Sequence, residues 1–205
     1  MVEGISQAII NFISQAGYPA IFALMVLESA LIPIPSEVTM PFAGFLASQG
    51  KVDFWLVVLI GAAGNLLGSL LAFALGFWGQ EKYVKNLIGK YGKFLLISVG
   101  EVEKAQDWFK KRGELIAFGS RLMPVVRTFI SLPAGFSRMN VFRFSLYTFA
   151  GAFLWSLFLT KIGAVLGENW SVLEVYFRKF ELIIVLLILL AVAGYGYRKI
   201  KIRYF

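Results

Sequence analysis

Residues 54–79 (FWLVVLIGAAGNLLGSLLAFALGFWG) contain no charged side chain. About 20 apolar residues in an α-helix cross the hydrocarbon core of a bilayer, so this segment is long enough to span a membrane. Its small residues Gly61, Gly64 and Gly68 allow close contact with another helix. A second apolar segment at 141–167 is also predicted to span. The two segments indicate an all-α polytopic membrane protein.

The composition agrees with this fold class. Of the 205 residues, 59% are hydrophobic and 16% are charged, and the mean hydropathy is +0.75. This balance is typical of a membrane protein and predicts a single membrane domain. The net charge of +8 is explained by membrane orientation, so no nucleic-acid partner is expected. The chain has no histidine and no cysteine, which excludes Ser-His-Asp and Cys-His catalysis and the usual zinc ligands. We therefore expect no enzyme activity, no metal and no cofactor.

Two further apolar segments are broken by proline and carry charge. In residues 18–46 the only charged side chains are Glu28 and Glu37, which flank Pro33 and Pro35. Proline removes a backbone donor and clashes with the preceding turn, so an unbroken span is not expected here. We predict a helical hairpin that enters the membrane and returns to the same side.

The second broken segment is residues 114–136. Beyond Glu114, its only charges are Arg121 and Arg127, on either side of Pro124. An arginine at membrane depth costs about 2.5–3.5 kcal/mol even on lenient insertion scales, and such groups mark function by default. Two acids in one broken segment and two bases in the other predict a transport site.

The two halves of the chain resemble each other. At an offset of 91 residues, Pro33 aligns with Pro124, and Ala-Gly-Phe at 43–45 aligns with the same tripeptide at 134–136. One hairpin plus one span is an odd number of crossings, so two successive copies face opposite ways. We predict inverted repeats whose hairpin tips meet near the bilayer midplane, the usual position of a secondary transporter's site.

The remaining segments are amphipathic or basic. Residues 1–16 and parts of 80–113 show apolar side chains at helical spacing, which predicts interfacial helices. Placing 80–113 and the C-terminal tail in the cytoplasm satisfies the positive-inside rule. Asp53 is predicted to cap the first span rather than to relay protons. The predicted organisation is a first repeat at 15–79, an amphipathic cytoplasmic linker at 80–113, a second repeat at 114–167, and a C-terminal transmembrane helix with a basic tail at 168–205.

These motifs resemble the DedA family, the group that shares the SNARE-associated or VTT domain. The resemblance covers residues 15–170. It is carried by residues 28–37 (ESALIPIPSE), by PFAG at 41–44, and by residues 119–128 (GSRLMPVVRT). The Arg-x-x-Pro-x-x-Arg element is fairly specific in this context.

The resemblance implies two opposed re-entrant loops in the cytoplasmic membrane of a bacterium or archaeon. It also implies a flippase or scramblase that moves an anionic lipid between leaflets, with undecaprenyl phosphate or an anionic phospholipid as substrate and with proposed coupling to the proton gradient. The family's functional acids and bases correspond to Glu28, Glu37, Arg121 and Arg127.

The residue types suit a lipid phosphate. A guanidinium is planar, always protonated and able to bind two phosphate oxygens, so Arg121 and Arg127 are predicted to bind the head group. Ser36 and Thr128 follow the prolines, where half-helix N-termini can direct their dipoles at an anion. A carboxyl group removed from water holds its proton more readily, so the two glutamates are predicted to carry protons.

Other functions are open from the sequence. The four charges could form a static salt-bridged lock between the two halves, without a ligand. The same acids could couple protons to a small ion or solute, or the chain could be a scaffold that organises lipids. An enzyme acting on lipid phosphates is disfavoured, because the chain has no histidine and no Asp-x-Asp motif. The sequence sets neither the lipid nor the oligomeric state.

Overall fold

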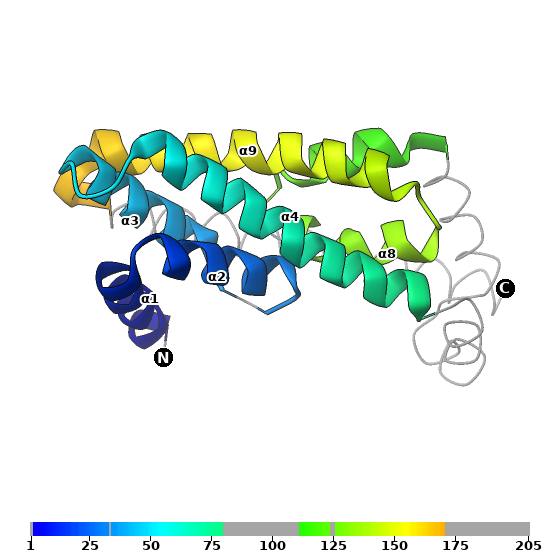
Figure 1. Cartoon of the computed structure of the whole chain (residues 1–205), viewed down its shortest axis with the longest axis horizontal. Coiled ribbons are helices and arrows are strands. Elements are labelled where there is room, and N and C mark those ends of the chain that lie inside the picture. The colour runs from blue at the N-terminus through cyan, green and yellow to red at the C-terminus, as the bar shows by residue number, and fades with distance from the viewer. Residues whose placement is uncertain (1, 33, 80–110, 124–125, 171–205) are drawn as a thin grey trace, which may run out of the picture.

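The computed structural model describes residues 2–32, 34–79, 111–123 and 126–170, and these residues are helical or in turns, without a strand. The two longest helices, α4 (Phe54–Trp78) and α9 (Val141–Leu166), extend along the molecule (Figure 1). By length and composition both could cross a membrane. Their bounds agree with the two predicted spans to within a residue.

Polar side chains fix the starts of both long helices. Asp53 Oδ1 accepts a hydrogen bond from Leu56 N at 2.7 Å, and Asn140 Oδ1 accepts one from Arg143 N at 3.1 Å. Such a cap contributes about 1 kcal/mol to helix stability. The Asp53 N–H also donates to Tyr18 Oη at 2.7 Å. The prediction that Asp53 is a helix cap is confirmed.

The first broken segment consists of α2 (Tyr18–Ser29) and α3 (Ser36–Ser48). It follows α1 (Val2–Ala16), the predicted amphipathic helix, which buries Ile9 and Ile13. Pro35, in an extended conformation, is the N-cap residue of α3. Pro33 lies outside the described residues. The predicted break between Glu28 and Glu37 is therefore present.

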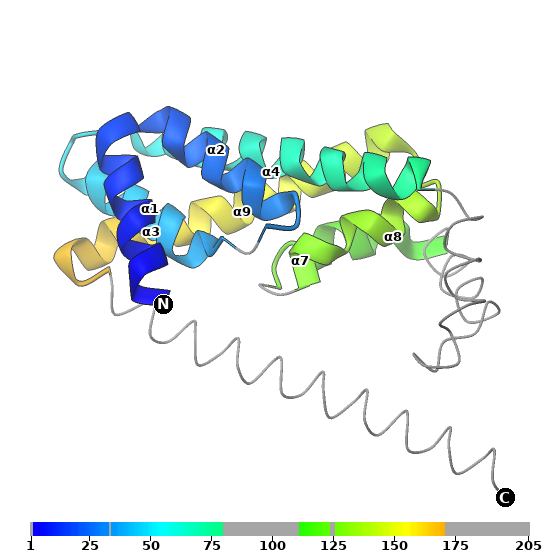
Figure 2. The same ribbon diagram turned by 90° about the horizontal axis from the view of Figure 1, so that it is seen from below.

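The second broken segment, residues 114–136, begins within a helix described at 111–120 and turns at 121–123. It continues with α7 (Val126–Phe129) and α8 (Ser131–Phe136). Pro124 lies outside the described residues. From mid-length of the molecule, α2 and α3 extend toward one end and α8 toward the other, with α7 beside the break between α2 and α3 (Figure 2).

Each broken segment has a first arm before its break (α2, or the helix at 111–120) and a second arm after it (α3, or α8). Glycines bring each second arm against a long helix. Gly44 of α3 lies so close to the Thr160 carbonyl of α9 that a Cβ there would overlap it. Gly135 of α8 makes the corresponding contact with the Phe73 carbonyl of α4. Each second arm thus packs against the long helix that belongs to the other half of the chain.

The first arms use glycines of the long helices instead. A Cβ at Gly64 of α4 would lie 2.7 Å from the Phe22 carbonyl of α2. A Cβ at Gly151 of α9 would lie 2.9 Å from the Phe118 carbonyl of the 111–120 helix. Each first arm therefore packs against the long helix of its own half, and the pattern of contacts is reciprocal.

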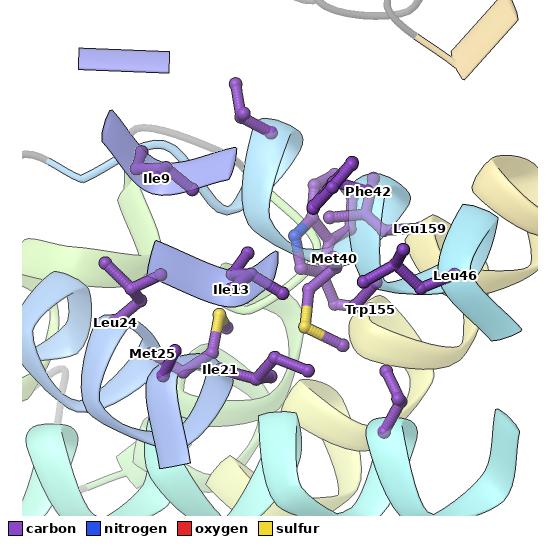
Figure 3. Packing of buried hydrophobic residues seen from close by; sticks show 14 residues of the cluster. Ile9, Ile13, Ile21, Leu24, Met25, Met40, Phe42, Leu46, Trp155 and Leu159 are labelled. Atoms are coloured by element: carbon purple, nitrogen blue, oxygen red, sulfur yellow. The ribbon is translucent and has the colours of Figure 1, made fainter. Parts of the chain in front are cut away.

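Two apolar clusters lie on either side of the middle. The larger joins α1, α2, α3, α4 and α9, and includes Ile13, Met25, Met40 and Trp155 (Figure 3). The smaller joins Phe73, Ala117, Ala134 and Phe144 toward the other end. The predicted linker up to residue 110 and the predicted C-terminal transmembrane helix lie outside the described residues.

Candidate functional site

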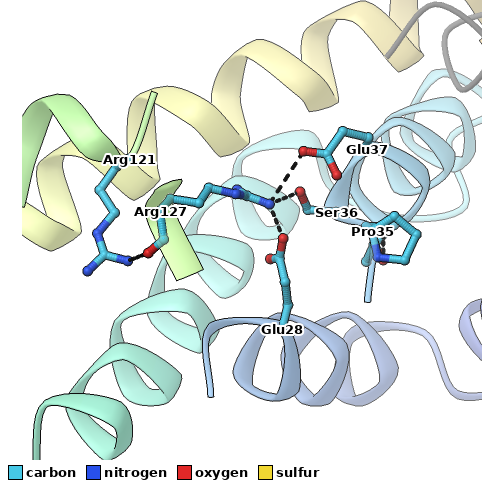
Figure 4. Close-up of polar contacts among 7 residues, drawn as sticks. Glu28, Pro35, Ser36, Glu37, Arg121 and Arg127 are labelled. Atoms are coloured by element: carbon cyan, nitrogen blue, oxygen red, sulfur yellow. Dashed lines mark hydrogen bonds and ion pairs between the residues drawn. The ribbon is translucent and has the colours of Figure 1, made fainter. Parts of the chain in front are cut away.

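Arg127 connects the two broken segments. Its Nη2 donates hydrogen bonds to Glu28 Oε1 and Ser36 Oγ, and lies 3.6 Å from Glu37 Oε1 (Figure 4). Glu28 lies near the end of α2, whereas Ser36 and Glu37 begin α3. Side chains from both sides of the first break therefore converge on a single nitrogen from the second broken segment.

This charge cluster is removed from solvent. Arg127 is 2% exposed, Glu28 3% and Glu37 5%. Hydrogen bonds between ionised groups are about twice as strong as neutral ones. Because breaking a buried pair leaves an uncompensated charge, it costs about 3–5 kcal/mol. The contact therefore joins the segments strongly and makes every member of the cluster sensitive to substitution.

Arg127 has unused hydrogen-bonding capacity. All three protein oxygens lie at Nη2, and in the described part of the chain Nε and Nη1 have no hydrogen-bond partner. Glu28 Oε2 also has none there. Buried polar groups without partners are rare and require a physical explanation. The guanidinium carbon also lies 5.3 Å from the centroid of the Trp155 ring, within cation–π range. The site thus holds an oriented guanidinium with N–H donors left for an anion.

Arg121 has a different environment. It is fully buried, and its Nη1 donates to the Arg127 backbone carbonyl at 2.7 Å. Its Nη2 donates to Ser131 Oγ at 2.9 Å and Thr148 Oγ1 at 3.4 Å. The guanidinium carbon lies 5.7 Å from the centroid of the Phe144 ring. These partners are neutral, and one of them is the main chain of Arg127 itself.

The long helix α9 leaves room for Arg121. A Cβ at Gly151 would lie 2.7 Å from Arg121 Cβ and 3.0 Å from its Cγ. The missing side chain at this position therefore lets the arginine stem pack directly against the helix backbone. Local sequence alone fixes neither this contact nor the hydrogen bonds at the far end of the side chain.

Of the predicted site residues, the structure brings Glu28, Ser36, Glu37 and Arg127 into contact. Arg121 touches this group only through the Arg127 carbonyl. Thr128 is half-buried and is the third residue of α7 rather than its first. The helix start expected at that threonine thus lies two residues earlier.

Several buried polar residues of the site were not predicted from the sequence. Ser131 and Thr148 hold Arg121, and Trp155 lies against Arg127. The available signal was the presence of hydroxyl groups inside apolar segments. Asn65 is also buried, and its Oδ1 has no hydrogen-bond partner in the described residues.

Two bilayer-length helices and charges buried between broken helices are features of an integral membrane protein. The VTT domain model matches residues 34–165 of this chain. The chain therefore belongs to the VTT-domain family, the DedA proteins, as its motifs predicted.

Known relatives cover nearly the whole chain. It is 31% identical to the "Undecaprenyl phosphate transporter A" of Staphylococcus aureus over 96% of this chain and 97% of the relative. It is 29% identical to the protein of the same name from Bacillus subtilis over 91% of this chain and 90% of the relative. No solved structure matches the chain.

Another relative carries a different kind of name. The "Alkaline phosphatase-like protein" of Lactococcus lactis subsp. lactis is 31% identical over 89% of this chain and 86% of the relative. This chain has no histidine or cysteine, and both are common zinc ligands. The family and the transporter names together favour a membrane transporter over an enzyme.

Proposed function

We propose that this protein moves a phosphate-bearing lipid, undecaprenyl phosphate or an anionic phospholipid, between the leaflets of a bacterial cytoplasmic membrane. In this proposal Arg127 binds the phosphate. The observation that carries it is the convergence of Glu28, Ser36 and Glu37 on Nη2 of a buried arginine whose other nitrogens are unpaired in the described residues. The names of the two transporter relatives support the substrate class.

The membrane arrangement is part of the proposal. The helices α4 and α9 span the bilayer, and the two broken segments are re-entrant hairpins of inverted repeats. The reciprocal glycine contacts support this arrangement, because Gly44 with Thr160 and Gly135 with Phe73 join equivalent arms to opposite long helices. Backbone without regular helix is tolerated at membrane depth only where protein or a water-filled cavity surrounds it. The contact between the two breaks meets this condition.

Charge balance connects lipid binding to protons. With all groups ionised, the two arginines and the two glutamates carry no net charge. A lipid phosphate adds negative charge, which is costly in a low-dielectric site. A proton bound by Glu28 or Glu37 removes one negative charge and frees Arg127 for the phosphate. Proton uptake therefore accompanies phosphate binding, and its release restores the ion pair when the lipid leaves.

Arg121 contributes by positioning. Its hydrogen bond to the Arg127 carbonyl holds the short helix α7 in place, while Ser131 and Thr148 fix the guanidinium. A four-residue helix has little stability of its own, because helix nucleation is unfavourable. Arg121 thus orients Arg127, the residue that binds the phosphate, and does not need to touch the lipid.

The competing function is a static lock, a salt bridge that only holds the two halves of the chain together. The same ion pairs favour it. If the cluster only joins the two halves, any pair of opposite charges at these positions would serve. The structure identifies the relevant pair as Glu28 and Arg127, whose side chains are in direct contact. Exchange of these two charges therefore distinguishes the lock from the phosphate site.

Proteoliposomes provide the direct test. We expect Arg127→Ala to slow flipping of a fluorescent polyprenyl phosphate by at least about tenfold, because hydrogen bonds to a charged group are each worth about 1.5–3 kcal/mol. Glu37→Gln should slow it as well and weaken its dependence on pH. Lys161→Gln, at an exposed cation of α9, is the matched control. Wild-type rates in both site variants would refute the assignment.

A further inference from the structure

A second cationic site lies at the end of the molecule where α9 begins (Figure 1). A cavity of about 640 Å³ is bordered there by residues 111–115, by the connection between α8 and α9, and by the first turn of α9. It is separate from the buried cluster, because none of the residues that contact Arg127 lines it.

The lining residues leave unbalanced positive charge. They include four cations, Lys111, Arg112, Arg138 and Arg143, and one carboxylate, Glu114. Arg143 Nη1 lies 2.5 Å from Glu114 Oε1, so these two charges compensate each other. No other acidic side chain lines the cavity in the described residues. Within the described part of the chain, Lys111, Arg112 and Arg138 therefore have no carboxylate of the cavity lining to compensate them.

Arg138 is held in a defined place beside the cavity. It has a left-handed backbone with φ of 51°, in the turn that follows α8, and its N–H donates to the Gly135 carbonyl at 3.0 Å. Its guanidinium carbon lies 5.9 Å from the centroid of the Phe77 ring. Contact with the face of an aromatic ring leaves the in-plane N–H groups available. Uncommon backbone conformations of this kind persist where the surroundings enforce them, and they are enriched at ligand sites.

Exposed apolar side chains lie in this cavity or next in sequence to residues around it. Leu115, which lines it, is 71% exposed, and Phe142, beside the lining residue Arg143, is 75% exposed. Trp78, which follows Phe77 in α4, is also 75% exposed. A ligand at this place therefore meets cations on one side and apolar surface on the other. That combination corresponds to a lipid with an anionic head group rather than to a soluble anion.

We propose that this cavity binds the phosphate head group of an anionic membrane lipid through Lys111, Arg112 and Arg138, with the acyl chains against Leu115 and Phe142. Basic cavities of membrane proteins at the level of the head groups bind such lipids. The site is a stationary lipid-binding site at one end of the protein, whereas the Arg127 cluster lies at mid-length.

The test is native mass spectrometry of the full-length protein, titrated in detergent with dioleoylphosphatidylglycerol or dioleoylphosphatidylcholine. Each cation near an anionic lipid contributes a factor of about five to binding. We expect Arg138→Gln to weaken binding of the first phosphatidylglycerol about fivefold. We expect the triple variant Lys111→Gln, Arg112→Gln, Arg138→Gln to weaken it more than about twentyfold, and phosphatidylcholine binding should not change in either variant.

Two control variants show whether the loss of binding belongs to this cavity. Arg138→Lys keeps the charge and should retain most of the affinity, and the double variant Lys51→Gln, Lys161→Gln removes two exposed cations elsewhere without effect. Binding to this cavity is measured without flipping, so failure of the proposed transport site would not affect the result. Wild-type affinity in the triple variant would overturn the proposal. Equal binding of both lipids, or inorganic phosphate binding as tightly as the lipid, would do so too.

Discussion

Arg121 and Arg127 are both fully or almost fully buried, and both come from the same broken segment. Their partners nevertheless differ in kind. Arg127 meets two carboxylates and a serine from the other broken segment, whereas Arg121 meets a carbonyl and two hydroxyl groups, all of them neutral. Burial alone therefore does not assign a function to an arginine. The charge and origin of its partners do.

The difference has a consequence for ligand binding. Arg121 uses both terminal nitrogens on neutral groups of the protein, and in the described residues only its Nε has no hydrogen-bond partner. Arg127 uses one terminal nitrogen, and its carboxylate partners can be neutralised by protons. We therefore assign a structural role to Arg121 and the binding of the anion to Arg127. Substitutions at these positions and around them test that division.

The largest effect is expected from removal of Arg127. Arg127→Ala leaves two buried carboxylates without a counter-charge, which should lower the free energy of unfolding by about 3–5 kcal/mol and abolish lipid flipping. Arg127→Lys keeps the charge but loses the planar fork, so it should restore much of the stability and little of the flipping. Unfolding in mixed micelles and flipping in liposomes measure the two quantities. Full flipping by the lysine variant would contradict a specific role for the guanidinium.

Removal of Arg121 should lower stability more than it lowers the affinity for the lipid. Arg121→Ala breaks three hydrogen bonds from a charged donor to neutral groups, each worth about 1.5–3 kcal/mol, so we expect a clear loss of stability. Because Arg127 remains, the affinity for the lipid phosphate in folded protein should fall less than in Arg127→Ala. Lipid affinity and unfolding free energy, measured on the same preparation, separate the two roles. An equal loss of affinity in both variants would show that Arg121 also binds the phosphate.

Gly151 provides a smaller and more local perturbation. In Gly151→Ala the new methyl group would meet Arg121 Cβ at 2.7 Å and the Phe118 carbonyl at 2.9 Å, and overpacking of this kind costs about 1–3 kcal/mol. Gly119→Ala is the matched control, because no atom lies within 4 Å of its new methyl group. We expect thermal stability to fall in the first variant only. A decrease in both would point to a general intolerance of side chains in this region.

The smallest effect is expected at the exposed pair of Arg143 and Glu114. Their side chains are 66% and 37% exposed, and such surface pairs contribute about 0–1 kcal/mol. Glu114→Gln should therefore leave unfolding and flipping close to wild type. A large loss of flipping would show that the basic end of the molecule takes part in transport, and would blur the distinction between the two cationic sites.

Much of the architecture followed from local sequence features. Apolar length predicted α4 and α9, Asp53 predicted a helix start, and Pro35 predicted a break. Opposite charges in the two broken segments also predicted that acids of one meet bases of the other, but not that the contact is between Glu28 and Arg127. These inferences succeed because each depends on one segment, or on the high cost of burying an unpaired charge.

The different roles of the two arginines could not be predicted from local sequence features. Arg121 and Arg127 are six residues apart across a break, and the direction of each side chain depends on distant partners. Thr148 and Gly151 of α9 hold Arg121 through contacts that no local periodicity encodes. The basic cavity likewise forms only because the turn after α8 lies beside residues 111–115.

Exchange of the two contacting charges tests the central claim most directly. In the double variant Glu28→Arg, Arg127→Glu the ion pair is reversed, and the net charge is unchanged. We expect this protein to fold better than either single variant, yet to flip lipid phosphate no faster than protein-free liposomes, because position 127 no longer carries a guanidinium. Flipping at the wild-type rate would show that the pair is only a lock, and would contradict Arg127 as the phosphate ligand.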